Sequence, residues 1–423
     1  MHSLIVPLTE TKAADANRFG PKAANLAALG QAGLPIPDGF CLDAEAYRRQ
    51  IAALGLHGAM ANINSHEPGR ARRAALDMKL GLLDQPIIAE ILDPLLAAWR
   101  DLVRRTGART VVRSSALVED RFGSSFAGQF ESYLGLETEE EFVTAVRSCW
   151  AALWSTRVLR YMAGHDASPA ETAMAVLIQP LIEARVAGGG LSQSHSGDMV
   201  LNATWGLGSS IAQGEVVPER IVLTRDGQHR DTALGRKYHR VSCAHNGRPL
   251  ARPLFSQRCL SPEQAVELGQ ILRRVEDFMG MPVEIEWAMD DKGFKLVQAR
   301  PLHLEPAAAP DEIWLRHPGL NGQPAGVGWA SGRARVVNCE CELSLVAPGD
   351  VLITKVAGPA LSEILPRVAG VVAELGGSTS HLASLGRERG IPMVLGVLDA
   401  TTRIPDGVQV AVDGVAGVVR WIQ

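Results

Sequence analysis

The chain has 423 residues, of which 46% are hydrophobic and 21% charged, the composition of an ordinary globular protein with two or three domains. It carries 42 Lys and Arg against 46 Asp and Glu, a formal net charge of −4. Because there is no excess of positive charge to bind a polyanion, nucleic acid is not expected as a partner.

The sequence also argues against a membrane partner and against a metal–thiolate site. The N-terminus has no basic segment followed by an apolar core, and no apolar run is long enough to span a bilayer, so a cytoplasmic protein is expected. The six cysteines are scattered except for Cys339 and Cys341. Since no second close pair and no nearby His accompanies these two, we expect no zinc site and predict reduced thiols.

A helix of about three turns is predicted near the N-terminus, because Pro21 suits a first helical position and Gly33 a C-terminal stop. Lys22 falls in the first turn of this helix, where the helix dipole disfavours a positive charge. Position alone leaves two interpretations open, a solvated surface lysine and a lysine placed to meet an anion. Residues 41–106 have a helical pattern and are expected to serve packing.

A strand and a loop with polar side chains follow. The segment 110–120, TVVRSSALVED, combines a predicted strand with Arg113 and two serine hydroxyls, and the loop 123–129, GSSFAGQ, contains Gly128. Small residues let backbone N–H groups approach phosphates closely, and an arginine supplies a bidentate fork. Taken alone, a loop of this composition is more often only a turn.

An amphipathic helix is predicted over residues 140–162, because apolar residues recur there at spacings of three and four. Its Trp150 and Trp154 are expected in the core. Residues 174–182, MAVLIQPLI, predict a buried strand that contains Gln179.

A β-hairpin is predicted over residues 283–301, because side-chain types alternate on both sides of a central glycine turn. With a three-residue loop, Glu286 falls opposite Gln298 and Glu284 opposite Arg300, so that all four side chains share one face. Oxygen ligands beside a cation suit a Mg²⁺ ion that bridges nucleotide phosphates. From spacing alone, an exposed cross-strand ion pair is an equally open alternative.

The last candidate is a histidine near the C-terminus. Residues 368–375, VAGVVAEL, predict a short buried strand, and residues 382–389 a short helix with Ser378 or Thr379 as its N-cap. His381 then lies at the helix N-terminus, where the partial positive charge favours a neutral, nucleophilic imidazole and also a phosphoryl group bonded to it. On position alone, such a histidine is more often a capping or packing residue.

Several of these stretches together resemble the phosphoenolpyruvate-utilising enzymes, a family that includes phosphoenolpyruvate synthase, pyruvate phosphate dikinase and rifampicin phosphotransferase. The stretches are FGPKAANLAAL at 19–29, VRSSALVED at 112–120, SSFAGQFESYLGL at 124–136, EIEWA at 284–288, LVQARP at 296–301 and GGSTSHLASLGRERGIPMVLGV at 376–397. The resemblance implies an α/β fold with ATP-grasp architecture in the nucleotide-binding domain. This domain is placed at 1–302, a linker at 303–324, and a small swivelling β/α phosphohistidine domain at 325–423.

The resemblance also implies the site residues and the cofactors, ATP and Mg²⁺. His381 matches the catalytic histidine that carries phosphate, and Glu286 and Gln298 match metal ligands. The positions that match nucleotide contacts are Lys22, Arg113, Gly128, Gln179, Ser192 and Arg300. Residues 187–195, AGGGLSQSH, depart from the family pattern, which has Phe-Thr and an Asp-Pro turn here. Either Ser192 replaces the threonine hydroxyl or the affinity for nucleotide has drifted.

The implied function is an AMP-forming phosphotransferase of the dikinase type, in which His381 passes phosphate from ATP to a small-molecule acceptor. Only about 22 residues separate the two implied domains, so no acceptor domain is expected between them. Either a partner subunit presents the acceptor, or a small acceptor binds in the cleft between the domains. Two alternatives are a non-catalytic ATP-binding regulatory or sensor protein and hydrolysis of ATP to AMP without an acceptor.

Overall fold

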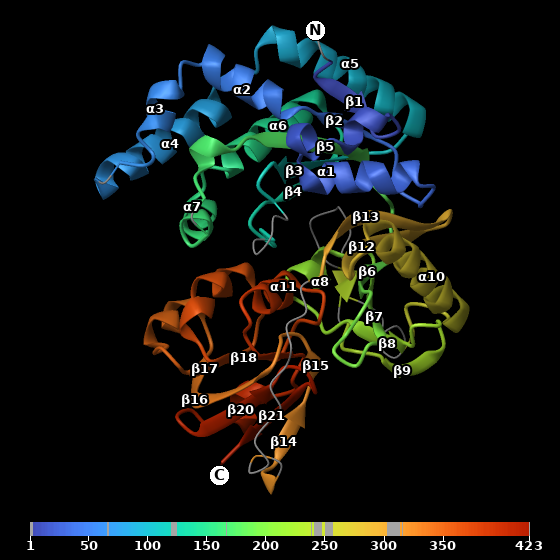
Figure 1. The fold of residues 1–423 in the computed structure, drawn as a ribbon, viewed down its shortest axis with the longest axis vertical. Coiled ribbons are helices and arrows are strands. Elements are labelled where there is room, and N and C mark those ends of the chain that lie inside the picture. The colour runs from blue at the N-terminus through green and yellow to red at the C-terminus, as the bar shows by residue number, and fades with distance from the viewer. Residues whose placement is uncertain are drawn as a thin grey trace. The chain divides into compact units, whose positions relative to one another are not determined.

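The computed structural model describes residues 3–422 except 66, 120–124, 166, 238, 241–247, 250–256, 303–313 and 315. The chain divides into two compact units, Met1–Ile182 with Lys295–Arg300, and Glu183–Phe294 with Pro301–Gln423. Each unit combines helices with β-sheet, which agrees with the predicted α/β class (Figure 1). Of the predicted linker 303–324, residues 303–313 and 315 lie outside the described residues.

The first unit is built on a five-stranded antiparallel sheet of order β1-β2-β5-β3-β4. Its strands are β1 (Ile5–Pro7), β2 (Phe40–Leu42), β3 (Thr110–Ala116), β4 (Ser132–Leu136) and β5 (Met174–Pro180). Strands β3 and β5 are buried almost throughout, and both were predicted as strands, β5 from its apolar run. These two strands carry Arg113 and Gln179.

Helices surround this sheet, and α1, α2, α5 and α6 pack against its strand β5 (Figure 1). The helices are α1 (Ala16–Gln31), α2 (Ala44–Ala53), α3 (His57–Ala61), α4 (Pro68–Asp84), α5 (Ala89–Thr106), α6 (Glu139–Ala152) and α7 (Thr156–Ala163), with short 3-10 turns at Thr11–Ala14 and Pro169–Glu171. Helix α1 is interrupted at Gly20, which has a φ of +74°, so its regular part starts at Pro21 as the sequence predicted. Only glycine fits there, since a Cβ would lie 2.5 Å from Ser115 Oγ.

The single helix predicted over 140–162 is wrong, because the structure has two helices, α6 and α7, separated by a short break. Ser155 causes the restart: its side chain accepts a hydrogen bond from the Val158 N–H at 3.3 Å and so caps α7. The prediction that both tryptophans are core residues is confirmed, since Trp150 is 0% and Trp154 2% exposed.

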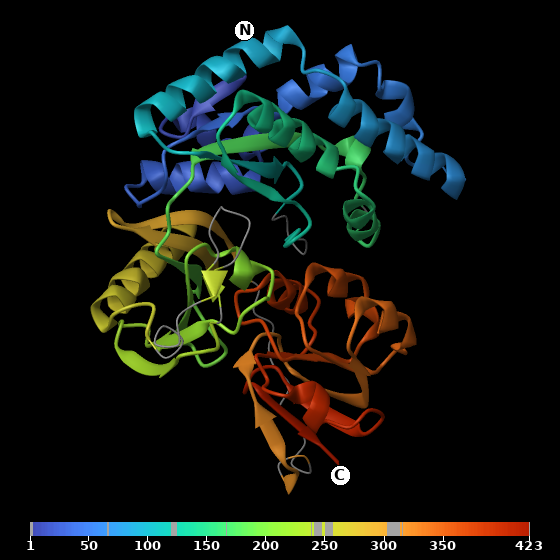
Figure 2. The same ribbon diagram turned by 180° about the vertical axis from the view of Figure 1, so that it is seen from behind.

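The described residues of the second unit form two large sheets and one small two-stranded sheet, and Figure 2 shows them from behind. The first large sheet has the order β13-β12-β6-β7-β8-β9, in which residues 295–300 of β13 belong to the first unit, and α10 packs against β7, β8 and β12. Its elements are β6 (Val186–Leu191), β7 (Met199–Trp205), β8 (Glu219–Leu223), β9 (His229–Ala233), α10 (Pro262–Met279), β12 (Val283–Asp290) and β13 (Gly293–Pro301), with the small elements α8 (Ser209–Ala212), β10 (His239–Arg240) and β11 (Arg248–Pro249). The predicted hairpin is therefore confirmed as β12 and β13.

The C-terminal part of the second unit is an eight-stranded sheet of order β14-β21-β20-β16-β17-β18-β19-β15, in which β16 to β19 pair in parallel. Its strands are β14 (Gly319–Asn321), β15 (Gln323–Pro324), β16 (Trp329–Val337), β17 (Val351–Thr354), β18 (Gly370–Ala373), β19 (Met393–Leu395), β20 (Gln409–Asp413) and β21 (Val418–Trp421). The helices are α11 (His381–Glu388) and α12 (Ala400–Arg403), with 3-10 turns at Glu340–Leu345, Pro359–Glu363 and Leu365–Arg367. Buried valines and isoleucines from β17, β18 and β20 form its core.

One prediction about the cysteines is wrong. A disulfide joins Cys339 to Cys341, whereas reduced thiols were predicted. Their separation of two residues in the chain already brings the two sulfur atoms near each other at the exposed start of a 3-10 turn. Cys41, Cys149 and Cys259 are free and buried.

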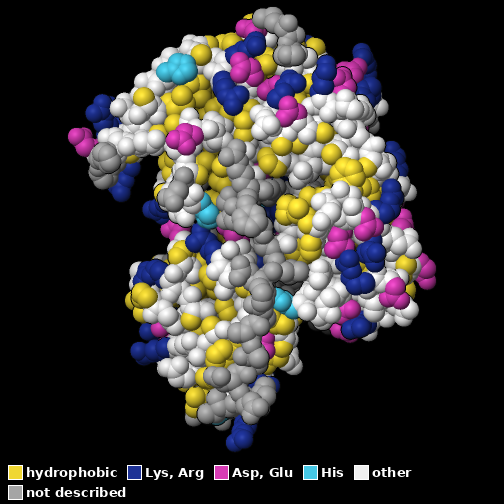
Figure 3. All heavy atoms as spheres, viewed as in Figure 1, with side chains coloured by type: hydrophobic (Ala, Val, Ile, Leu, Met, Phe, Trp, Pro, Cys, Tyr) yellow, Lys and Arg dark blue, Asp and Glu magenta, His cyan; other side chains and the backbone are white. Residues whose placement is uncertain are grey.

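The surface has no single-sign expanse of charge on the face shown in Figure 3, where Lys and Arg are interspersed with Asp and Glu. Within the described part of the chain, no helix has both the length and the apolarity needed to cross a membrane.

Candidate functional site

His381 is the first residue of α11, which follows β18 after a short loop, so it lies at a helix N-terminus as predicted. The predicted N-caps, Ser378 and Thr379, are wrong. Ser380 caps the helix instead, because its extended backbone lets its hydroxyl accept a hydrogen bond from the Ala383 N–H at 3.2 Å. The histidine side chain is half-buried.

Arg387 ties the helix to the loop that precedes it. Its guanidinium donates hydrogen bonds to the backbone carbonyls of Ser378 at 2.6 Å and Ala325 at 3.3 Å, and only 5% of the residue is exposed. Since Ser378 precedes the helix and Arg387 lies in its last turn, this side chain fixes the loop and α11 as one body. His381 lies between these two anchor points.

The histidine loop lies against one face of the six-stranded sheet. Glu286 on β12 is directly opposite Gly189 on β6, and Gly189 is directly opposite Asn202 on β7, so the three residues share one face. The Thr379 hydroxyl donates to Asn202 Oδ1 at 3.1 Å, and a Cβ at Gly189 would lie 2.6 Å from Thr379 Cβ. The residue two positions before His381 therefore sits beside the predicted metal ligand Glu286.

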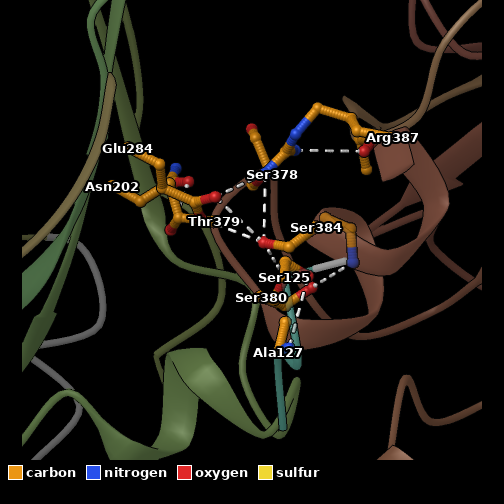
Figure 4. Close-up of polar contacts among 11 residues, drawn as sticks. Ser125, Ala127, Asn202, Glu284, Ser378, Thr379, Ser380, Ser384 and Arg387 are labelled. Carbon is orange, nitrogen blue, oxygen red and sulfur yellow. Dashed lines mark hydrogen bonds and ion pairs between the residues drawn. The ribbon is translucent and has the colours of Figure 1, made fainter. Parts of the chain in front are cut away.

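Glu284 lies on the same face, because it is two residues from Glu286 on β12. Its carboxylate accepts hydrogen bonds from the Ser384 hydroxyl at 3.1 and 3.0 Å and forms an ion pair with Arg387 at 3.0 Å (Figure 4). The sequence placed Glu284 opposite Arg300 on the hairpin. The structure adds the contacts with Ser384 and Arg387 of α11, which no local pattern encodes.

The departure from the family pattern at 187–195 has a steric explanation in this fold. A Cβ at Gly188 would lie 1.8 Å from the Asn202 carbonyl oxygen and 2.9 Å from the Trp287 ring, and a Cβ at Gly189 would collide with Thr379 on the other face. Backbone this close to neighbouring side chains requires glycine. The glycine run of β6 thus makes room for the histidine loop on one face and for a buried tryptophan on the other.

Lys22 lies in the first unit, with its ammonium 2.9 Å from a carboxylate oxygen of Glu119 and 2.9 Å from the Ser114 carbonyl oxygen. Its side chain is 11% exposed, which excludes the solvated surface lysine of the two interpretations. The anion that it meets in this structure is Glu119, itself 2% exposed.

Arg113 and Gln298, predicted to contact nucleotide and metal respectively, are neighbours in the first unit. The Arg113 guanidinium donates to Gln298 Oε1 at 3.0 Å and also to the Val297 carbonyl. Arg113 is 9%, Gln298 8% and Arg300 5% exposed. The predicted registers of Gln298 with Glu286 and of Arg300 with Glu284 stay predictions.

Gln179, predicted to contact nucleotide, is 3% exposed, and among the described residues its Nε2 has no hydrogen-bond partner. An unpaired buried amide donor costs free energy, so a ligand acceptor is a physical reason for it to be there. Gly128 has a φ of +67°, which favours glycine at this point of the small-residue loop.

Ser192 is differently placed. Its hydroxyl donates to Glu276 at 3.0 Å and accepts from the Val283 N–H at 2.8 Å, and the residue is 0% exposed. Both of these bonds serve the packing of α10 and β12 against β6, so the hydroxyl is already engaged within the protein. Its predicted nucleotide contact has no support from these bonds and stays a prediction.

Sequence reasoning missed Asn202, Ser384 and Glu119 and gave no role to Arg387. Three of these four lie inside motifs that were recognised, but their partners are far away in the chain. The one available signal was Arg387 itself, since a charged residue within the apolar turns of α11 needs a buried partner.

The described part of the chain thus holds a buried Lys22 and Arg113 in the first unit and a histidine at a helix start in the second. The sequence model of the pyruvate phosphate dikinase AMP/ATP-binding domain matches residues 16–315, and that of the mobile domain of phosphoenolpyruvate-utilising enzymes matches residues 346–417. The chain belongs to the phosphoenolpyruvate-utilising enzyme family. The predicted fold class, and ATP and Mg²⁺ as the cofactors used in this family, are thereby confirmed.

Similar proteins include the phosphoenolpyruvate synthase of Aeropyrum pernix, 31% identical over 95% of this chain and 56% of its own length. The probable phosphoenolpyruvate synthase of Methanothermobacter thermautotrophicus is 30% identical over 96% of this chain and 61% of its own length. The chain thus spans little more than half the length of these relatives. The solved D-alanine-D-alanine ligase from Coxiella burnetii covers 66% of this chain and 47% of its own at 10% identity and a TM-score of 0.27, which carries no argument.

Proposed function

We propose that the chain is an ATP-dependent phosphotransferase of the dikinase type, which forms a phosphohistidine at His381, releases AMP and phosphate, and passes the phosphoryl group to a small-molecule acceptor. Membership of the family and similarity to proteins named phosphoenolpyruvate synthase support the class of reaction. The domain boundaries at 302 and 325 and the roles of the site residues are part of the same proposal.

One observation carries the proposal. In the loop that ends in His381, Thr379 lies against Gly189 and bonds to Asn202. Gly189 is directly opposite Glu286 on the neighbouring strand. Neighbouring strands bring such opposite positions to within about 5.5 Å of each other. A loop that only capped a helix would have no need of a seat on the strand next to Glu286, a half-buried carboxylate from a distant part of the chain.

In the proposed reaction, an imidazole nitrogen of His381 attacks the β-phosphorus of ATP, and the bond to the oxygen shared with the α-phosphate breaks, so that AMP leaves. Water then removes the terminal phosphate as inorganic phosphate, and His381 keeps the phosphoryl group. The covalent intermediate divides one difficult transfer into two easier ones. Lys22, Arg113 and Arg300 would hold the phosphate oxygens and oppose the charge that develops on them.

The donor set suits Mg²⁺. Glu286 offers a carboxylate that is half-buried, and Gln298 offers an amide oxygen with one lone pair occupied by Arg113 and a second one available. Bound there, the metal would supply neutralisation of phosphate charge. The Gln298 amide is neutral, so Glu286 is the only negative charge in this donor pair. The first unit, which contains Gln298 and Arg113, can therefore accept an anionic nucleotide.

The acceptor belongs to the same proposal. It is a small molecule that takes the phosphoryl group from His381 in a second transfer, either presented by a partner subunit or bound beside the histidine domain. Glu119 would release Lys22 when a phosphate arrives, because a charged nucleotide competes with the carboxylate for the ammonium.

The test is incubation with Mg²⁺ and ATP labelled with ³²P at the β-position, comparing the wild type with His381→Ala and following both protein label and AMP. Acid-labile label with AMP release, absent from the variant, is the expected result. AMP release without protein label would instead indicate hydrolysis without an acceptor. Binding of ATP with neither label nor AMP would contradict the proposal and favour a sensor protein.

A further inference from the structure

We infer that Glu284 is a positioning residue. By binding Arg387 and Ser384 of α11, it determines the position of His381 on the sheet face that carries Glu286. This inference rests on the proposed function, since it concerns the transfer of phosphate onto His381. The sequence had assigned Glu284 only to the hairpin.

Glu284, Ser384 and Arg387 contact one another. Glu284 Oε2 is 3.0 Å from Arg387 Nη2, the Ser384 hydroxyl donates to both carboxylate oxygens, and Arg387 Nη2 lies 3.2 Å from the Ser384 hydroxyl. All three residues are buried, with exposures of 5% for Glu284, 5% for Arg387 and 6% for Ser384 (Figure 4). A second strand residue, Asn202, holds the same loop through Thr379.

These contacts lie close to the histidine along both α11 and β12. Ser384 is three residues after His381, about one helical turn or 4.5 Å along the axis. Glu284 precedes Glu286 by two residues on β12, or about 7 Å along the strand. Because Arg387 also binds the carbonyl of Ser378, the loop and the helix cannot move separately while Glu284 holds Arg387.

The chemistry suits a contact that must form and release. The desolvation cost of a buried ion pair offsets most of its Coulombic gain, so the pair adds little net affinity between α11 and the sheet. A misplaced helix would leave both charges buried and unpaired, so the pair disfavours that arrangement. An apolar contact of the same size would hold the helix in many orientations. A pair of opposite charges with a bridging hydroxyl accepts one orientation, and both charges regain water when the helix leaves.

The experiment measures the initial rate of His381 labelling from β-³²P ATP in the full chain for the wild type and Glu284→Gln. We expect the variant to be at least about tenfold slower, because removing one charge of a buried pair leaves the other uncompensated. Affinity for a non-hydrolysable ATP analogue should remain within about twofold. Phosphoramidate, a small donor that transfers its phosphoryl group to imidazole with loss of ammonia, should label His381 at the wild-type rate because it needs no docking.

Three variants control for folding and charge. Glu267→Gln removes a carboxylate from the exposed side of α10 in the same unit and should match the wild type. Glu284→Asp keeps the charge and should recover most of the rate. Ser384→Ala removes the bridging hydroxyl but leaves the ion pair, and a loss of about threefold is expected for one hydrogen bond.

The outcomes separate the two claims. Labelling of Glu284→Gln by ATP at the wild-type rate would overturn the positioning role and leave the proposed function intact. Equal loss of labelling by ATP and by phosphoramidate would also overturn it, since the histidine itself would then be damaged. A wild type that phosphoramidate labels but ATP does not would overturn the proposed function, and the inference that depends on it.

Discussion

Gly189→Ala tests whether the histidine loop is seated on the sheet during phosphate transfer. The added Cβ would lie 2.6 Å from Thr379 Cβ, 2.7 Å from its Oγ1 and 2.9 Å from its Cγ2. Thr379 must recede by roughly 0.8 Å to reach ordinary van der Waals separation. That movement also lengthens the hydrogen bond from Thr379 to Asn202, which is 3.1 Å in this structure.

The cost follows from these contacts. Overpacking a well-packed site costs about 1–3 kcal/mol, and here it falls only on the arrangement in which the loop touches β6. An energy of that size lowers the population of the seated loop by about 5- to 150-fold. We therefore expect labelling of His381 from ATP to slow within this range, while the strand itself stays folded.

The assay is the initial rate of ³²P incorporation from β-labelled ATP, with Gly190→Ala as the matched control. Gly190 is the next residue on β6, and its Cβ would point to the opposite face, 3.2 Å from Ile285 and Leu201. This variant should lose at most about threefold, since flexible side chains there can yield. Equal rates in the two variants would refute the view that Thr379 is seated on Gly189 when phosphate is transferred.

Three further predictions concern titration and stability. The described free thiols are Cys41, Cys149 and Cys259, and burial raises the pKa of each to about 12. Iodoacetamide at pH 8 should therefore modify none of them in the folded protein. Peptide mapping that finds these cysteines modified would contradict their burial. Burial and the charge of Arg387 lower the pKa of His195, against a smaller opposing effect of Asp413. The unfolded state then binds more protons just below pH 6.5, so stability should fall as the pH drops through the native pKa, and an NMR titration midpoint at or above 6.5 would be inconsistent with this. Lys237→Met leaves Glu219 buried without the ammonium 2.8 Å away, and should cost about 3–5 kcal/mol in urea unfolding, with the loss largely recovered in the double variant that adds Glu219→Gln.

The local elements of this protein could be predicted from the sequence because their signals are local. Pro21 marks a helix start, the apolar run at β5 marks a buried strand, and glycine between alternating segments marks the β12–β13 hairpin. Resemblance to a family then assigned roles to His381 and Glu286. The break between α6 and α7 was missed because apolar periodicity continues through it, although Ser155 offered a capping signal.

The sequence by itself thus determined most of the helices and strands, and its resemblance to a family supplied the residues that we propose for phosphate transfer. Only the tertiary structure decided that Glu284 pairs with Arg387 and Ser384, that Thr379 lies on Gly189, and that Glu119 meets Lys22. These partners are about a hundred residues or more apart in the chain, and a buried charge or a glycine indicates that a neighbour is needed without indicating which residue it is. The identity of that neighbour follows from how β6, β12 and α11 pack, which no periodicity within any one of them records.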